Sequence, residues 1–353
     1  AFPDHEGPQG MFINGKQSGQ IVLDGIRAAT NYRHYPSTAR LDADSKAALW
    51  SYSGGSSPSQ WAVELANSYA PDLVKNNLVG AAIGAAPTSD MGEMVNYNKN
   101  KITIGLIPLA INGLVRAYPE YDLSGVLSGK GKALVEEAGH YGTIDGIVEI
   151  AAKWVDDTHG DVGLEYYTTD PSRPVNSWPV VDALERANSI NFQPSQAGTP
   201  RIPTLIYHDT NDGLVPVAPE DTWIRKYCKE GSPVQVMRTR TDLPNIDLSF
   251  LELTGTQSSR LWSLIAKDIT RISIHFVLEF PHLLPALNYL SGRFNGVTPR
   301  NDCGQIPYAT WDNNPPGQWN GWQWVGRNAP WELQPDLLPG TSSRKAYRAF
   351  DTN

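Results

Sequence analysis

Short apolar runs of strand length alternate along the chain with longer segments whose apolar residues recur every three or four positions. The first pattern is typical of buried strands, and the second of helices with one buried face. Predicted strands cover residues 47–50, 78–83, 204–207 and 234–237, and predicted helices cover 15–32, 53–69, 217–229 and 281–294. Neighbouring parallel strands need a long crossover, usually a helix, so the alternation predicts a parallel sheet covered on both faces. The predicted fold class is α/β.

Two segments interrupt this alternation. Residues 88–200 separate two predicted strands and carry helical patterns of their own, for instance at 134–140 and 144–155. We expect them to form a helical cap over the carboxyl edge of the sheet, where α/β folds place their ligands. Residues 239–271 are far longer than the roughly 2 to 6 residues usual between a strand and a helix. They are expected to be an insertion, whose structure the pattern leaves open.

The longest uncharged apolar run covers residues 102–115. It is shorter than the roughly 20 residues that a membrane-spanning helix needs, and Gly105, Pro108 and Gly113 interrupt it. No transmembrane segment is predicted. The run suits a lid or a wall for an acyl chain, and it equally suits an ordinary buried helix of the cap.

Composition and charge narrow the classes of partner. The 353 residues allow one large domain or two ordinary ones, and 40 % hydrophobic residues exclude a disordered chain. Acidic residues outnumber basic ones, 37 against 29, which gives a formal charge of −8. A surface that binds nucleic acid needs a basic excess, so nucleic acid is not an expected partner. No cofactor motif or metal-ligand spacing is found, and His140, His159, Asp156 and Asp157 are expected to be solvated.

The clearest candidate for a catalytic motif is the segment Trp50-Ser51-Tyr52-Ser53-Gly54-Gly55, between a predicted strand and a predicted helix. In α/β hydrolases the nucleophilic serine occupies a strained strand-to-helix turn of pattern G-x-S-x-G, in which small residues let backbone segments approach closely. Ser51 replaces the first glycine here and is small enough to be tolerated. We interpret Ser53 as a candidate nucleophile, and the alternative is a plain polar turn.

A serine hydroxyl needs a base to take its proton and a carboxylate to orient that base. After the strand at 204–207, both Asp209 and Asp212 could supply the carboxylate, and Asp212 is the better placed of the two. Downstream, His275 follows a short apolar segment, whereas His282 could be a helix-start residue without a chemical role, so His275 is favoured. The order serine, aspartate, histidine along the chain is the order expected for this fold.

Taken together, these motifs resemble the fungal secretory lipases typified by Candida antarctica lipase A. The matching stretches, in order and spacing, are residues 3–8, 23–27, 52–55, 69–71 and 79–81, then His208, Asp212, residues 215–216, 275–279, 284–287 and 293–296. The resemblance covers residues 2–90 and 200–308 well and the segment between them loosely.

The resemblance implies an α/β-hydrolase core formed by residues 1–87 and 201–308, with an inserted helical cap or lid at 88–200. Compared with these lipases the chain opens several strands into the sheet, so the core is expected to be incomplete at its N-terminus. Residues 309–353 have no counterpart and are expected to be a C-terminal extension. The Trp cluster of that extension (Trp319, Trp322 and Trp324) could contact carbohydrate or lipid, or simply pack against the extension.

The resemblance also implies roles for individual residues. Ser53 is the expected nucleophile, His275 the base and Asp212 the orienting acid, and the backbone N–H of Gly54 is the expected oxyanion donor.

Composition alone leaves Cys228 and Cys303 as either a bridge or two buried thiols. The resemblance implies a disulfide between them, which fits secretion.

The expected function is therefore that of an extracellular triacylglycerol lipase without a cofactor, acting on an ester at a lipid–water interface. Two alternatives stay open at this point. One is a carboxylesterase or acyltransferase that uses the same residues on small soluble esters. The other is a catalytically inactive fragment that binds lipid or glycan.

Overall fold

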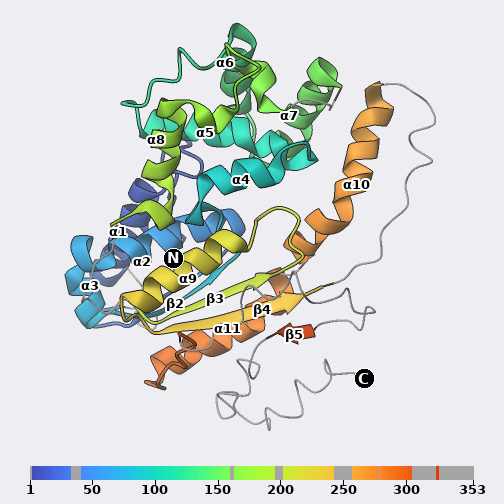
Figure 1. Cartoon of the computed structure of the whole chain (residues 1–353). Coiled ribbons are helices and arrows are strands. Elements are labelled where there is room, and N and C mark those ends of the chain that lie inside the picture. The colour runs from blue at the N-terminus through green and yellow to red at the C-terminus, as the bar shows by residue number, and fades with distance from the viewer. Residues whose placement is uncertain are drawn as a thin grey trace.

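A five-stranded sheet runs through the part of the chain that the computed structural model describes (Figure 1). That part comprises residues 2–32, 41–159, 163–194, 202–241, 257–277, 279–303 and 323–325. In spatial order the strands are β1 (Ala47–Tyr52), β2 (Leu78–Gly84), β3 (Thr204–Asp209), β4 (Val234–Arg240) and β5 (Gln323–Val325). Strands β1 to β4 pair in parallel, and β5 pairs antiparallel with β4. The predicted α/β class is confirmed.

Helices cover both faces of this sheet (Figure 1). One face packs against α1 (Lys16–Asn31), α2 (Ser56–Tyr69), α3 (Pro71–Asn76) and α9 (Ala218–Lys229), and the other against α11 (Glu279–Phe294). Successive side chains of a strand point to opposite faces. Ile83 of β2 therefore packs with Trp61 and Trp223 on the first face, whereas the adjacent Ala82 packs with Tyr289 on the second. Both cores are fully buried, which explains why the strands read as continuous apolar runs.

Five helices occupy most of the segment between β2 and β3: α4 (Met91–Asn98), α5 (Leu106–Ala117), α6 (Gly129–Ala138), α7 (Thr143–Thr158) and α8 (Pro179–Asn188). Figure 1 shows them gathered on one side of the molecule, away from α11. They have apolar cores of their own, in which Leu109 of α5 packs with Trp154 of α7. Helix α4 also contacts the loop after β3, because Asn98 donates a side-chain hydrogen bond to the carbonyl of Leu214.

Helix α10 (Gln257–Val277) occupies the end of the segment that the sequence pattern left open. Leu261, Ile265 and Ile272 are spaced at helical intervals and pack with Ile147 of α7. His275 consequently lies in the last turn of a long helix, and not after a short separate segment as the sequence analysis supposed. The pattern was missed because this stretch was treated as an insertion, whereas its apolar face packs against the helices between β2 and β3.

Some predictions of the sequence analysis concern residues outside the described part of the chain. Residues 242–256 of the supposed insertion lie outside the described residues, and so does the C-terminal extension apart from β5. The predicted Trp cluster falls there as well, and only the backbone at position 324, within β5, is described.

Cys228, at the end of α9, forms a disulfide with Cys303, 75 positions further along the chain. The bridge ties the first face of the sheet to the segment that follows α11.

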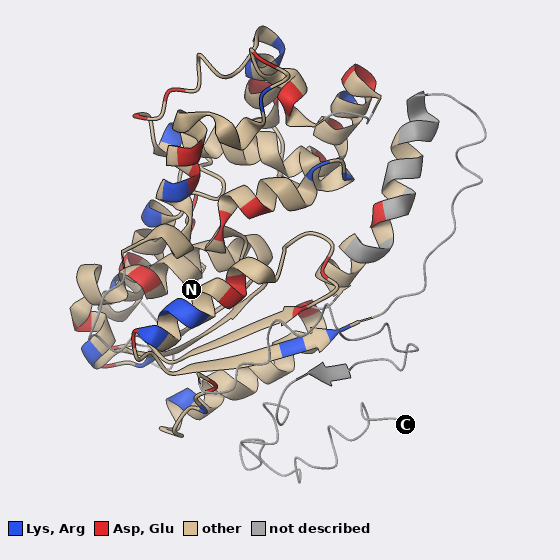
Figure 2. Cartoon of the chain, in the orientation of Figure 1, with Lys and Arg blue, Asp and Glu red and all other residues tan. Residues whose placement is uncertain are grey.

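Charged residues lie mainly on the outer helices, and the strands are mostly uncharged (Figure 2). Strands β3 and β4 are the exceptions, because β3 ends in Asp209 and β4 carries Arg238 and Arg240 near its carboxyl end. Within the described residues, no helix combines the length and the apolarity needed to span a membrane.

The packing of α1 on α2 predicts opposite effects for two glycines of the same helix. A Cβ atom at Gly19 would lie 2.7 Å from the backbone carbonyl carbon of Trp61, which cannot move aside. At Gly25 the nearest atom would be Cβ of Pro3, at 3.3 Å, in a segment without regular structure. We expect Gly19→Ala to lower the free energy of unfolding by about 2 kcal/mol through overpacking. Gly25→Ala should raise it by up to about 1 kcal/mol through helix propensity.

Urea unfolding of both variants measures the difference. Equal effects of the two substitutions would contradict the proposed close approach of α1 and α2.

Candidate active site

Ser53 lies directly after β1, at the start of a single 3₁₀ turn (Ser53–Gly55) that leads into α2. Its φ is +55°, a left-handed backbone conformation that is strained for a residue with a side chain. This is the strand-to-helix turn that the sequence pattern predicts for a nucleophilic serine. The close backbone approach expected at Gly55 is not seen there, since a Cβ atom built on it would meet no atom within 4 Å.

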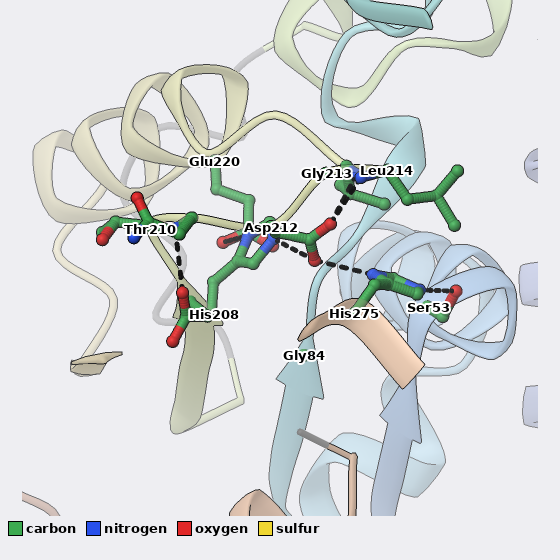
Figure 3. A network of polar contacts seen from close by, with 12 residues as sticks. Ser53, Gly84, His208, Thr210, Asp212, Gly213, Leu214, Glu220 and His275 are labelled. Atoms are coloured by element: carbon green, nitrogen blue, oxygen red, sulfur yellow. Dashed lines mark hydrogen bonds and ion pairs between the residues drawn. The ribbon is translucent and has the colours of Figure 1, made fainter. Parts of the chain in front are cut away.

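His275 reaches this serine from the end of α10. Its Nε2 atom lies 2.6 Å from Oγ of Ser53, and its side chain is fully buried (Figure 3). The hydroxyl of Tyr52 donates a hydrogen bond of 2.8 Å to the backbone carbonyl of His275. The residue beside the serine therefore fixes the backbone that carries the histidine, although the two residues are 223 positions apart.

Asp212, in the loop after β3, completes a chain of three residues. Its Oδ2 lies 2.6 Å from Nδ1 of His275, and its Oδ1 accepts hydrogen bonds from the backbone N–H groups of Leu214 and Val215 at 2.7 and 2.9 Å. The hydroxyl of Tyr97, on α4, donates to the backbone carbonyl of Asp212 and so helps to fix the loop. When His275 donates through Nδ1 to Asp212, its Nε2 can accept the proton of the Ser53 hydroxyl.

The carboxyl group of Asp212 is held in its ionised form although it is buried. Burial alone would raise its pKa, but the neighbouring His275 and His208 outweigh burial and hold the pKa well below its usual range.

Asp209 and His282, the alternatives to Asp212 and His275 in the sequence analysis, have other partners in the structure. Asp209 accepts hydrogen bonds from the hydroxyls of Thr239 and Thr241, at 2.8 and 2.9 Å, and so ties β3 to the end of β4. His282 is buried in α11, with its Nε2 3.0 Å from the hydroxyl of Thr239. Asp212 and His275 are thus the pair that the structure brings to Ser53.

The sequence analysis named His208 only as a matching position and gave no role to it, and the structure places it in β3 as a fully buried histidine. Its Nε2 lies 3.0 Å from the same oxygen of Asp212 that faces His275 (Figure 3). On its other side, Nδ1 lies 3.0 Å from Oε2 of Glu220 on α9. The spacing of four residues between His208 and Asp212 was a signal, but only the turn after β3 brings their side chains together.

The helices between β2 and β3 enclose an apolar cavity of about 70 Å³. Ile107, Ile111 and Leu114 of α5 contribute to its lining, so part of the uncharged run predicted at 102–115 forms a cavity wall. Within the described part of the chain, no three His, Cys, Asp or Glu side chains are grouped so as to hold a metal ion.

Comparison with known proteins adds independent evidence. The model of the secretory lipase family matches residues 1–301. The chain belongs to the secretory lipase family.

Three curated proteins are similar to the chain over much of its length. Lipase A of Moesziomyces aphidis is 28 % identical over 304 residues, which cover 85 % of this chain and 55 % of that protein. Lipase 6 of Candida albicans is 31 % identical over 65 % of this chain and 48 % of its own length. A trichothecene C-3 esterase of Fusarium sporotrichioides is 29 % identical over 66 % of this chain and 50 % of its own length. The chain spans about half the length of the curated relatives it matches.

Among solved structures, that of Candida antarctica lipase A superimposes with a TM-score of 0.60 at 24 % identity. The match covers 88 % of this chain and 62 % of that one. At this identity the match speaks for the fold alone, and it agrees with the α/β-hydrolase architecture expected of a secretory lipase.

From the burial of His282 in α11 we expect the fold of this secretory lipase family member to lose stability in acid. Burial, together with the nearby charge of His208, lowers the pKa of His282 to about 3. In the unfolded chain a histidine takes up its proton near pH 6.5. The contribution of neutral, buried His282 to the free energy of unfolding is therefore complete above about pH 6.5 and is lost as the pH falls toward 3. The loss is on the order of 3 kcal/mol by pH 4.

We expect His282→Gln to make the free energy of unfolding fall less steeply between pH 6.5 and 4 than in the wild type. The exposed His140 provides the control, because His140→Gln should leave that slope unchanged. Denaturant unfolding at several pH values gives both slopes, and identical slopes in the wild type and His282→Gln would exclude this role.

Proposed function

We propose that the protein is a secreted serine ester hydrolase that cleaves triacylglycerols at a lipid–water interface. The observation that carries the proposal is the continuous chain from Oγ of Ser53 through His275 to Asp212, with both contacts at 2.6 Å. A strained serine at a strand-to-helix turn, a histidine base and an ionised carboxylate are the parts that acyl transfer to serine requires. Membership of the secretory lipase family supports the substrate class, and the disulfide supports an oxidising, extracellular location.

The proposed reaction has two halves. Oγ of Ser53 attacks the ester carbonyl carbon while its proton passes to Nε2 of His275, and Asp212 stabilises the imidazolium that results. Gly54 is the middle residue of the 3₁₀ turn between β1 and α2. Its backbone N–H donates to the oxyanion of the tetrahedral intermediate. The intermediate collapses, and His275 gives its proton to the leaving alcohol oxygen. Water, activated by His275, then attacks the acyl-enzyme, and the fatty acid leaves as Ser53 regains its proton.

The cavity lined by α5 is the proposed site for the acyl chain. Its lining is mostly apolar, with Thr168 and Glu185 as polar members, so it would favour hydrocarbon over a polar group. We propose in addition that residues 88–200 act as a cap over the site. The contacts of Tyr97 and Asn98 with the loop that carries Asp212 support this, because they tie α4 to the catalytic edge of the sheet.

Labelling with a fluorophosphonate tests the triad. The reagent phosphonylates an activated serine, so mass spectrometry should locate the label on Ser53 and nowhere else. His275→Ala should abolish the reaction, and Asp212→Asn should slow it by roughly four orders of magnitude, because the base loses its orientation and its counter-charge. Asp209→Asn is the matched control: it alters a buried aspartate at the end of β3, whose partners are Thr239 and Thr241, and should retain most of the wild-type rate.

Circular dichroism shows that each variant is folded before the rates are compared. An unlabelled but folded wild-type protein would remove the catalytic proposal, and a non-catalytic protein that binds lipid would then be favoured.

The dependence of rate on tributyrin concentration tests the substrate class. A lipase that works at an interface should show a steep rise in rate once tributyrin exceeds its solubility limit and forms droplets. The similarity to an esterase named for a trichothecene substrate favours a second candidate, an esterase for small soluble esters. Its rate should saturate below that limit, and this result would replace the triacylglycerol proposal while leaving the triad in place.

A further inference from the structure

His208 is a completely buried titratable group beside the candidate active site. It projects from the carboxyl end of β3, is 0 % exposed, and lies between two carboxylates. Asp212 faces its Nε2 and Glu220 faces its Nδ1, each at 3.0 Å (Figure 3). The proposed reaction leaves this histidine without a role.

Asp212 is shared between two histidines. Its Oδ2 contacts Nδ1 of His275 at 2.6 Å and Nε2 of His208 at 3.0 Å, while its Oδ1 accepts two backbone N–H groups. A carboxylate has about four lone-pair positions, so all of them are filled. His208 and the loop backbone therefore hold the carboxylate in a fixed orientation, with one position left for His275.

The surroundings of His208 also set its charge. Nε2 of His208 forms a hydrogen bond with Asp212, and Nδ1 lies within ion-pair distance of Glu220, at 3.0 Å, without hydrogen-bond geometry. Two carboxylates beside one buried ring favour its imidazolium form. Glu220 is itself fixed, because it accepts from Arg238 of β4 at 3.1 Å and from the backbone N–H of Ala86 at 2.7 Å. Burial alone would lower the pKa of His208, but Glu220 and Asp212 outweigh it and raise the pKa to about 9.

We propose that His208 is a positioning residue, a buried cation at neutral and acidic pH that orients Asp212 toward His275 and offsets part of its negative charge. This inference rests on the proposed function of Ser53, His275 and Asp212. Its consequence is electrostatic. A fully uncompensated Asp212 would stabilise the protonated form of His275 more strongly, and the protonated form cannot accept the proton of Ser53. The cation at position 208 therefore keeps the base available at lower pH.

The charged and titratable groups around His208 come from four elements: Asp212 from the loop after β3, Glu220 from α9, Arg238 from β4 and His282 from α11. Arg238 lies behind Glu220 and His282 is neutral at ordinary pH, so His208 is the cation that contacts Asp212 on the side away from His275.

His208→Gln tests the proposal, because glutamine can still donate a hydrogen bond to Asp212 but carries no charge. The rate constant for fluorophosphonate labelling of Ser53, measured from pH 4 to 9, should keep its plateau within about tenfold. Its acidic limb should move to higher pH by about one unit, as expected for the loss of one nearby cation. The matched control is His282→Gln, which removes a second buried but uncharged imidazole of the same region and should leave the limb unmoved.

Two magnetic resonance measurements on the full chain complete the test without requiring activity. In the wild type, the ¹⁵N shifts of both ring nitrogens of His208 should report a doubly protonated ring at pH 7.5. In Glu220→Gln, which removes one of its two carboxylates, that ring should lose a proton at least one pH unit lower than in the wild type. This variant also serves if His208→Gln does not fold.

The outcomes separate the two proposals. A folded wild type whose Ser53 does not react would refute the proposed function, whatever the state of His208. A reactive Ser53 with an acidic limb that does not move in His208→Gln, or that moves equally in His282→Gln, would refute the role of His208 alone. A singly protonated His208 at pH 7.5 would do the same.

Discussion

The ionised carboxylate of Asp212 is almost completely buried, and much of the surrounding structure is what such a charge requires. An unpaired charge at this depth would be severely destabilising, since removing one partner of a buried ion pair costs about 3–5 kcal/mol. Four contacts from the loop backbone and two histidines satisfy it, and those histidines come from β3 and α10. The carboxylate thus joins one strand of the sheet to a helix more than 60 positions further along the chain.

Charges alternate outward from that carboxylate. On the side away from His275, His208 contacts Asp212, Glu220 follows His208, and Arg238 follows Glu220 and also pairs with Asp221 at 3.0 Å. Each buried charge has an opposite charge beside it, so the array avoids the cost of an isolated ion in a poorly polarisable interior. Because Glu220 also binds the N–H of Ala86, the array fixes the point at which the chain leaves β2 for the helices α4 to α8.

The backbone at Ser53 is strained. Ser53 adopts a left-handed conformation between a strand that is paired along its length with β2 and a helix packed against α1. Neither neighbour can shift to relax the turn, so the serine hydroxyl stays directed at His275. The hydroxyl of Tyr52 adds a second constraint on the same histidine from the backbone side. Orientation at the site is therefore fixed by packed elements, and does not depend on flexible loops alone.

The sequence by itself determined the alternating strands and helices, the turn that carries Ser53, and the set of residues among which its partners had to be found. These features follow from local periodicity and from a short motif, which a linear reading can detect. The choice of Asp212 over Asp209 and of His275 over His282 rested on position along the chain. Only the tertiary structure shows which pair contacts Ser53, because it brings residues 222 positions apart to 2.6 Å. The helical state of residues 257–277 and the surroundings of His208 are seen only in the tertiary structure, since one depends on packing against α7 and the other on carboxylates from two separate elements.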